Sequence, residues 1–331
     1  MKNFIDSGKE IKIGLLRGGP GKERGLSLNT GVSFIKNIPK EYIVKDVIIS
    51  KDLSWNLRGV QTSPEKILRD VDLVINSIHG DFGEDGSLQR VLNNFSIPYT
   101  GSRALPSLMS FNKYFAKKIF ENAGLKTPRY IIVKNDLEVE KIALDIFRGF
   151  GIPLIMKPVS GGSSNDIFVA RDFDTLLFSL GDLLNKYETI LVEEFIEGKQ
   201  ITCGVIDNFR NEETYELMPL EIILNKGEDF FDYSKKDLPA QAGGTTFSCP
   251  TSLPISLKKD VQKIANKAHN VLNLRHYSRS DFIVSPRRGI YLLETNALPD
   301  LSENAPFVRE LNEVGVGLPS FINHLINLTL Y

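Results

Sequence analysis

Apolar residues follow two alternating patterns along the first third of the chain. Short uninterrupted apolar runs predict buried strands, and stretches in which apolar residues recur every three or four positions predict helices. The predicted strands are 11–16, 42–49 and 73–78, and the predicted helices are 26–35 and 64–70. Because strands that alternate with helices favour a parallel sheet, we expect an α/β domain that ends at the turn sequence PYTGS, residues 98–102.

The pattern changes after this turn. A helical region at 104–124 is followed by mixed strands and helices, and the chain from residue 190 onward is typical of a strand-rich region. We predict strands at 130–133 and 153–156 and helices at 137–147, 174–184 and 318–328. The charged, glycine-containing stretch 225–244 is long enough to be an active-site lid or a disordered insertion.

Residues 277–300, YSRSDFIVSPRRGIYLLETNALPD, predict a β-hairpin with its turn at the arginine pair. The alternation places Asp281 opposite Glu294 and Arg279 opposite Asn296. Since side chains two residues apart share a face, these four polar groups should project from one side of the hairpin. The residues expected on the opposite, core-facing side are Phe282, Val284, Tyr291 and Leu293.

The polar face of this hairpin is a candidate metal site. Two carboxylates and an amide oxygen suit Mg²⁺, which prefers oxygen ligands and often shares them with phosphates. The guanidinium of Arg279 beside them indicates anionic chemistry. A cross-strand set of ion pairs on a solvated sheet face is the alternative interpretation of the same residues.

The composition of this 331-residue chain, 42% hydrophobic and 24% charged, is ordinary for a soluble globular enzyme. A net charge of -1 provides no general attraction to nucleic acid or to an anionic membrane, so we expect neither as a partner. Two cysteines, Cys203 and Cys249, are too few for a disulfide framework and fit a reducing compartment. With no signal-peptide pattern and no long apolar window, the sequence predicts a cytoplasmic protein.

Three small-residue turns follow predicted strands and are candidate ligand loops. LRGGPGKERGLSLNTG contains Glu23, which is suited to an ammonium group, and IHGDFGEDGSLQ contains His79 at the carboxyl end of a strand. IMKPVSGGSSND places Lys157 ahead of a hydroxyl-rich loop, an arrangement that suits phosphate oxygens. The plain alternatives are a tight turn with a solvated glutamate, a structural histidine and a flexible linker.

Nine short segments spread over the chain form an ordered series. They are GGPGKERGLSLNTG, HGDFGEDGSLQ, PYTGS, the Asn112-Lys113 step, IMKPVSGGSS, LVEEFIEG, FDYSKK, YSRSDF and LLETNALP. In order and spacing the series resembles the D-alanine:D-alanine ligases, which are ATP-grasp enzymes of peptidoglycan synthesis, over essentially the whole chain. The resemblance implies a three-domain ATP-grasp fold, α/β at the N-terminus and α+β in the grasp domains. The implied limits are 1–102 for an N-terminal parallel-sheet substrate domain, 103–184 for a central domain and 185–331 for a C-terminal catalytic domain.

The resemblance also implies roles for individual residues. For ATP it implies phosphate contacts from Lys113, Lys157, Ser163 and Ser164, adenine contacts from Glu193, Phe195 and Ile196, and a ribose contact from Gln200, where the family usually has glutamate. For two Mg²⁺ ions, or Mn²⁺ in their place, it implies Asp281, Glu294 and Asn296. For the amino-acid substrates it implies Glu23, His79, Arg279 and Asp300, and for catalysis Arg279, Glu23, Ser163 and Lys236. The implied reaction joins two D-alanines through an acyl phosphate, and the implied assembly is a homodimer.

Four departures from the family pattern fall where substrates should bind. Asp237 replaces an aromatic residue, Asn165-Asp166 replaces a small apolar pair, and Asp300 replaces a glycine at the oxyanion turn. Ala305 and Pro306 replace a serine and a backbone N–H that bind the acceptor carboxylate, and proline has no N–H to donate. These departures leave open an acceptor other than D-alanine, or a nucleotide-binding homologue without catalysis.

Overall fold

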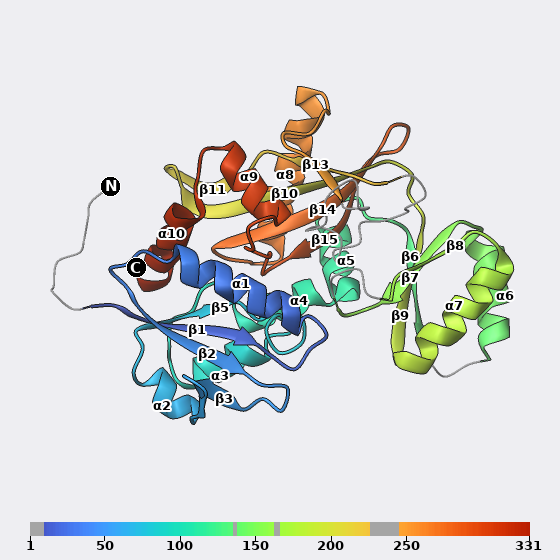
Figure 1. The fold of residues 1–331 in the computed structure, drawn as a ribbon. Coiled ribbons are helices and arrows are strands. Elements are labelled where there is room, and N and C mark those ends of the chain that lie inside the picture. The colour runs from blue at the N-terminus through green and yellow to red at the C-terminus, as the bar shows by residue number, and fades with distance from the viewer. Residues whose placement is uncertain (1–9, 135–137, 162–165, 226–244) are drawn as a thin grey trace.

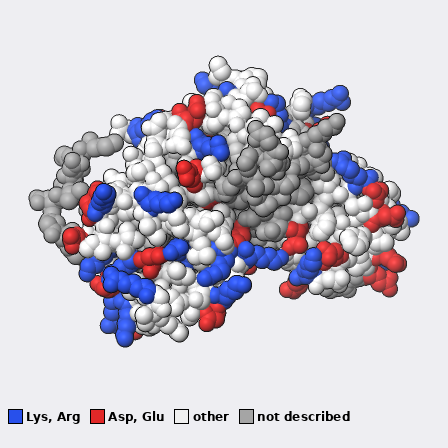
Figure 2. Space-filling model, in the orientation of Figure 1, with Lys and Arg blue, Asp and Glu red and all other residues white. Residues whose placement is uncertain are grey.

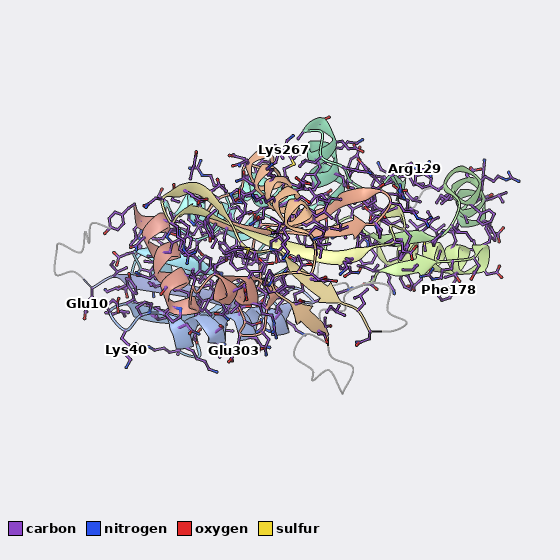
Figure 3. The ribbon with its side chains drawn as sticks, turned by 90° about the horizontal axis from the view of Figure 1, so that it is seen from above. Glu10, Lys40, Arg129, Phe178, Lys267 and Glu303 are labelled. Carbon is purple, nitrogen blue, oxygen red and sulfur yellow. The ribbon has the colours of Figure 1, made fainter. Side chains whose placement is uncertain are left out.

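The described residues form three β-sheets, each built mainly from a different part of the chain (Figure 1). The computed structural model describes residues 10–134, 138–161, 166–225 and 245–331. The sheet that contains β6 to β9 lies at one end of an elongated molecule, with Arg129 and Phe178 on that end in Figure 3. Over the described residues, every helix is too short or too polar to cross a lipid bilayer.

The N-terminal sheet confirms the predicted parallel arrangement. Its three longest strands are β1 (Lys12–Gly18), β2 (Ile43–Ile49) and β5 (Leu73–Asn76), and β1 pairs in parallel with both of the others. The helices of this region are α1 (Arg24–Asn37), α2 (Pro64–Leu68) and α3 (Ser87–Asn94). The short antiparallel strands β3 (Trp55–Leu57) and β4 (Val60–Gln61) extend one edge and were not predicted, because two or three residues are too few for a periodic signal.

The helical region predicted at 104–124 is two helices rather than one. They are α4 (Ala104–Phe111) and α5 (Lys113–Asn122). Between them Asn112 is extended, and its side-chain oxygen accepts hydrogen bonds from the N–H groups of Tyr114 and Phe115 at 3.1 Å each. An asparagine in this position satisfies free donors at the start of a helix, so it ends α4 and begins α5.

The central sheet has the order β6-β9-β7-β8 and is antiparallel throughout. Its strands are β6 (Tyr130–Lys134), β7 (Leu154–Pro158), β8 (Phe168–Ala170) and β9 (Thr189–Glu194). Helices α6 (Val139–Phe150) and α7 (Phe173–Lys186) cover one face and share a core with it (Figure 1). Strand β9 belongs to this sheet although it lies beyond residue 184, the predicted end of the central domain. The domain limits themselves stay a prediction.

The third sheet carries the predicted hairpin at one edge. Its strands are β10 (Lys199–Phe209), β11 (Glu212–Glu216), β12 (Leu220–Ile223), β13 (Thr246–Ser248), β14 (Tyr277–Ser285) and β15 (Gly289–Asn296). Helices α8 (Ile255–Val271), α9 (Pro306–Glu313) and α10 (Leu318–Leu330) complete the chain. Only α10 was predicted, although α8 buries Val261, Ala265 and Ala268 at helical spacing.

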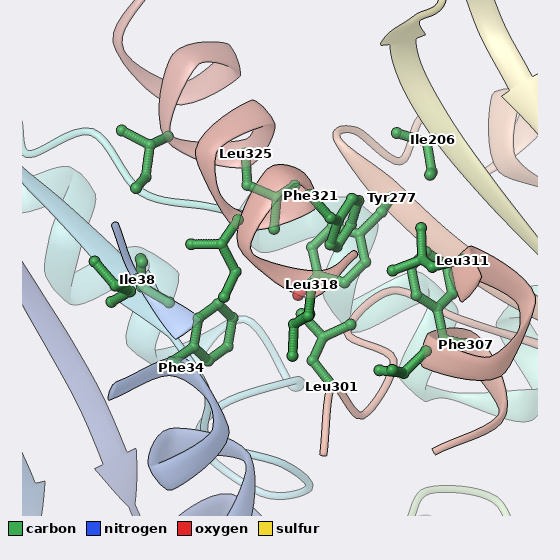
Figure 4. Close-up of a cluster of buried hydrophobic side chains, with 14 of the residues drawn as sticks. Phe34, Ile38, Ile206, Tyr277, Leu301, Phe307, Leu311, Leu318, Phe321 and Leu325 are labelled. Atoms are coloured by element: carbon green, nitrogen blue, oxygen red, sulfur yellow. The ribbon is translucent and has the colours of Figure 1, made fainter. Parts of the chain in front are cut away.

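A shared hydrophobic core joins the two ends of the chain. Phe34 and Ile38, at the end of α1, pack with Phe321 and Leu325 of α10 and with other side chains around Tyr277 (Figure 4). Helix α5 instead packs against the third sheet, where its Phe120 is fully buried. The N-terminal sheet is therefore held to the C-terminal helices by apolar contacts and not by a linker alone.

The register of the hairpin confirms one prediction and corrects another. Asp281 pairs with Glu294 and Arg279 with Asn296, as the alternation predicts. The register then shifts at a bulge between Asp281 and Phe282. A bulge adds one residue to one strand and reverses the faces beyond it. Leu292 therefore joins Phe282 and Val284 in the core, whereas Tyr291 and Leu293 pack with Ile196 and Ile283 on the other face.

Three of the four histidines gather around Asp207 and are structural. His269 lies 2.8 Å from Ser278 Oγ and 3.1 Å from Asp207 Oδ1, and His324 Nε2 lies 2.8 Å from the Asp207 carbonyl oxygen. Ser278 is fully buried, so this serine, histidine and aspartate are not accessible to a substrate. Nδ1 of His276 accepts a hydrogen bond from the Gly101 N–H at 3.2 Å, which ties the N-terminal region to the third sheet.

Acid should weaken this connection. Burial, aided by the neighbouring Arg275, lowers the pKa of His276 to about 3, so the residue is neutral in the folded state. The unfolded chain takes up the proton near pH 6.5, so stability is lost as the pH falls from 6.5 towards 3, by about 1.4 kcal/mol per pH unit. We expect urea unfolding at pH 7 and pH 5 to show this loss, and His276→Asn to reduce it. Asparagine tolerates the positive φ of 69° at this position and keeps an acceptor for Gly101. An unchanged pH dependence in the variant would refute the assignment.

Candidate active site

A cavity of about 280 Å³ lies where the three sheets approach one another. Its described lining includes charged groups from every sheet region, namely Lys22, Glu23, Asp81, Lys113, Lys157 and Glu294. Four predicted site residues that are far apart in the sequence therefore line one cavity, namely Glu23, Lys113, Lys157 and Glu294. On most of the face shown in Figure 2, Lys and Arg are interspersed with Asp and Glu, and Lys and Arg are more frequent at the lower left.

Lys113 is held at the edge of this cavity by the cap of α5. Its backbone N–H donates to the Val159 carbonyl at 2.8 Å, and its ammonium group contacts the Gly161 carbonyl at 2.5 Å. The ammonium also lies 3.8 Å from Glu294 Oε2. Burial, together with nearby Lys157, lowers the pKa of Lys113, and the Glu294 carboxylate opposes this effect. The nearest carboxylate neutralises this buried ammonium group only in part, so the group can form a charge-assisted hydrogen bond with a phosphate oxygen.

Lys157 belongs to a buried triad that sequence reasoning missed. Its ammonium lies 2.7 Å from Glu193 Oε2, and Lys117, one turn after Lys113, lies 2.6 Å from Glu193 Oε1. Burial raises the pKa of Glu193, but the two ammonium groups outweigh it and lower that pKa to about 2. Two cations and one anion leave one positive charge. The Glu193 side chain therefore fixes Lys157 at the cavity wall, while its predicted adenine contact stays a prediction.

On the polar face of the hairpin, two residues of the same strand, Arg279 and Asp281, form a bidentate ion pair. Arg279 donates from Nε to Asp281 Oδ1 at 2.9 Å and from Nη2 to Asp281 Oδ2 at 2.8 Å. The ion pair therefore runs along one strand and not across the hairpin. Such a bidentate contact holds the planar guanidinium in a defined direction.

Asp281, Glu294 and Asn296 fit a site for a hard cation. Glu294 has 37% of its side chain exposed and faces the cavity, and its strand position is directly opposite Asp281. Asn296 Oδ1 accepts the Leu298 N–H at 2.7 Å and still has a second lone pair. In the part of the chain that is described, no three His, Cys, Asp or Glu side chains gather as a metal site, so the asparagine is needed to complete the oxygen set.

Glu23 and His79 lie together on the N-terminal side of the cavity. Glu23 precedes α1, and its Oε2 lies close to the Gly80 backbone, 2.4 Å from where a Cβ atom would be. The φ of 71° at this position favours glycine. His79 follows β5 and is buried, with its Nδ1 3.2 Å from Glu84 Oε1. Glu84 also accepts the Gly80 N–H at 3.1 Å, so it braces its own loop.

The carboxylate of Asp166, which follows the predicted phosphate-binding loop, is contacted by two lysines and a tyrosine. Lys22, from the glycine-rich turn, places its ammonium 2.9 Å from Asp166 Oδ2 and 3.0 Å from the Tyr187 hydroxyl, which itself donates to Asp166 at 2.5 Å. Lys186 lies 3.5 Å away on the other oxygen. The Tyr187 and Lys22 contacts lower the pKa of Asp166 to about 2. This cluster links the N-terminal and central regions at the cavity.

The residues predicted to hold adenine and ribose lie on β9, in the connection that follows it, and on β10. Ile196 is buried with Ile283 and Tyr291, and so provides an apolar wall. The Phe195 N–H donates to the Pro153 carbonyl at 3.1 Å, so only its carbonyl group remains for a ligand. Gln200 is half-buried on β10 opposite Ile283.

Other sequence predictions lie outside the described residues. They are Ser163, Ser164, Asn165, Lys236, Asp237 and all but the first residue of the long stretch 225–244. The acceptor departures are described: Ala305 is buried and precedes α9, and Pro306 is its first residue. Asp300 is also buried, with its carboxylate hydrogen-bonded to Thr30 and Ser302.

The three sheets and the shared cavity with its charged lining define an ATP-grasp enzyme. The family model described as D-ala D-ala ligase C-terminus matches residues 119–327, and the model described as D-ala D-ala ligase N-terminus matches residues 57–102. This chain belongs to the D-alanine–D-alanine ligase family.

Individual relatives agree over nearly the full length. D-alanine–D-alanine ligase B of Clostridium perfringens is 32% identical over 97% of this chain and 98% of its own. The D-alanine–D-alanine ligase of Desulfotalea psychrophila is 33% identical over 97% of this chain and 96% of its own. The solved structure of the Bacillus anthracis ligase complexed with ATP is 26% identical, covers 97% of each chain and has a TM-score of 0.79.

Proposed function

We propose that this protein is the ligase that joins two D-alanines at the expense of ATP, giving D-alanyl-D-alanine, ADP and phosphate for peptidoglycan synthesis. The observation that carries the proposal is the single cavity lined by Glu23, Lys113, Lys157 and Glu294. It places a group suited to an amino-acid ammonium beside cations suited to phosphates. The relatives named above support the same reaction.

The chemistry follows from these charges. Lys113 and Lys157 bind the phosphates of ATP, while Glu23 holds the ammonium of the first D-alanine so that its carboxylate faces the γ-phosphate. The carboxylate oxygen takes the γ-phosphoryl group and ADP leaves, which creates an acyl phosphate. The neutral amine of the second D-alanine then attacks the carbonyl carbon and forms the C–N bond. The C–O bond to the phosphoryl group breaks, and phosphate departs with that oxygen and the bonding electron pair, while the amine releases its proton to the departing phosphate.

Arg279 is the residue we assign to the tetrahedral oxyanion of that second step. Its guanidinium is fixed by Asp281, so it does not need to reorganise as charge develops. A preorganised donor of this kind is worth about 3 kcal/mol. Mg²⁺ bound by Asp281, Glu294 and Asn296 would supply further neutralisation of phosphoryl charge.

Further properties belong to the same proposal. We assign Ser163, Ser164 and Lys236 to the phosphates, Glu193, Phe195, Ile196 and Gln200 to the adenosine, and His79 and Asp300 to the amino-acid side of the site. We also propose the domain limits 1–102, 103–184 and 185–331, a homodimeric assembly and a cytoplasmic location, where ATP and D-alanine are available. Light scattering of the purified protein tests the assembly.

A second candidate function is a ligase of the same type with another acceptor. It is favoured by Ala305 and Pro306, which remove two groups that would bind an acceptor carboxylate. A carboxylate buried without partners is costly, so such an acceptor would carry its charge elsewhere or have none.

A coupled ADP-release assay over D-amino acids, L-amino acids and D-hydroxy acids separates these candidates. The main proposal predicts release stimulated most by D-alanine alone. The second predicts that D-alanine needs a different partner compound for turnover. ATP binding without turnover under any condition would contradict both and favour a non-catalytic homologue.

The ion pair between Lys22 and Asp166 should help to hold the N-terminal and central regions together at the cavity. We expect Lys22→Ala to raise KM for D-alanine and ATP about twofold to fivefold, because an exposed ion pair contributes about 0.2–1 kcal/mol. Lys186→Ala also removes a positive charge next to Asp166. Lys186 is on α7, in the same central region as Asp166, so its contact does not join two regions of the fold. Steady-state kinetics should therefore show little change for this control. Equal effects of the two variants would mean that only the charge of Asp166 matters.

A further inference from the structure

A line of hydrogen bonds connects three separate segments behind the amino-acid side of the cavity. His79, after β5, lies 3.0 Å through Nε2 from the hydroxyl of Thr30 on α1. The Thr30 hydroxyl donates to Asp300 Oδ1, after β15, at 2.5 Å. Thr30, His79 and Asp300 are each 3% exposed or less, so water does not compete for these bonds.

The positions of the protons follow from counting donors. A threonine hydroxyl has one proton, and here a carboxylate, which accepts only, takes it. That carboxylate already accepts the Ser302 N–H at 2.8 Å and the Ser302 hydroxyl at 2.5 Å, as an ionised group would. The remaining Thr30–His79 contact then requires His79 Nε2 to carry a proton.

The other ring nitrogen reaches a second carboxylate. Nδ1 of His79 lies 3.2 Å from Glu84 Oε1, which also accepts the Gly80 N–H. This contact requires a proton on Nδ1 too. With donors on both sides, the ring is an imidazolium ion.

We propose that Asp300 and Thr30 are positioning residues that hold His79 doubly protonated beside Glu23, and so fix the wall of the site for the first amino acid. The inference rests on the proposed function for the role of that site. A cation clamped at both nitrogens cannot rotate, and it keeps Gly80 against the Glu23 carboxylate. Loss of one ring proton would turn a lone pair towards either Thr30 or Glu84 and loosen this loop.

The charged surroundings agree. The groups that face His79 are Glu84 from its own loop, Glu23 from the start of α1 and Asp300 from the loop after β15. Burial lowers the pKa of His79, but these three carboxylates outweigh it and raise that pKa. Tyr277, near Glu84 and Asp300, is neutral because burial raises its pKa.

The direct experiment is ¹⁵N NMR of selectively labelled histidine in the full chain, where only four histidines contribute signals. His79→Asn assigns the signals of His79. We expect both its ring nitrogens to be protonated at pH 7.5, and its titration to move about one pH unit lower in Asp300→Asn and in Thr30→Val. The alkaline limb of kcat/KM for D-alanine should move with it.

Ser302→Ala is the matched control. It removes one hydrogen bond to Asp300 but leaves the charge and the Thr30 contact, so the His79 titration should stay in place. A wild-type His79 with only one protonated ring nitrogen at pH 7.5, or a titration unmoved in Asp300→Asn, would overturn the proposal. The NMR result needs no turnover. Should the ring be doubly protonated in a protein without ligase activity, the proposed function fails while the assignment of His79 stands.

Discussion

Glu294→Gln should abolish turnover while the protein stays folded. The substitution keeps the size of the side chain but removes one of the two facing carboxylates and the negative charge 3.8 Å from Lys113. We expect kcat to fall about a thousandfold, which corresponds to about 4 kcal/mol of lost charge stabilisation. The Mg²⁺ concentration needed for the residual activity should rise as well.

Stability separates this effect from misfolding. Glu294 is partly exposed, and the buried Lys113 ammonium keeps its contact with the Gly161 carbonyl in the variant, so thermal unfolding should be close to that of the wild type. Glu212→Gln, an exposed glutamate on β11, is the control with the same chemical change and should keep full activity. Undiminished kcat in Glu294→Gln would contradict the metal assignment.

Arg279→Lys should lower kcat about a hundredfold or more. Lysine keeps the charge but cannot form the fork to both oxygens of Asp281, so the cation is no longer directed at the developing oxyanion. KM for ATP should change little, because this loss is confined to the transition state. Steady-state kinetics at saturating substrates gives the measurement.

Arg275→Lys is the matched control, since this arginine precedes the same strand. It donates to the carbonyls of Gly101 and Tyr99 at 2.7 and 3.0 Å, and so joins two parts of the fold. We expect this variant to lose about 1–3 kcal/mol of stability and to keep kcat. If Arg279→Lys lost stability and kept kcat as well, Arg279 would be structural.

The strength of the periodic signal decided which elements could be predicted. The N-terminal α/β arrangement follows from long strands and helices that alternate, and the structure contains it. Helix α8 was missed although its buried positions have helical spacing, because lysines and asparagines separate them. The hairpin register was predicted correctly, but the bulge after Asp281 inserts one residue without a local sequence signal.

The candidate site was predictable where it consists of local motifs. Asp281 and Glu294 face one another because a hairpin with a known turn fixes its pairs. Contacts between distant segments had no such signal. Lys22 meets Asp166 across 144 positions, and Thr30 meets Asp300 across 270. Both aspartates were recognised only as departures from a family pattern, and the folded chain provides the partners that neutralise or orient them.

An isotope experiment can follow the oxygen that the acyl phosphate transfers from D-alanine to phosphate. The protein is incubated with ATP and D-alanine labelled with ¹⁸O in its carboxylate, and both the dipeptide and the released phosphate are analysed by mass spectrometry. We expect D-alanyl-D-alanine together with phosphate that carries one ¹⁸O atom, since the carboxylate oxygen leaves with the phosphoryl group. Phosphate without label, or ADP formed without D-alanyl-D-alanine, would contradict the proposed reaction.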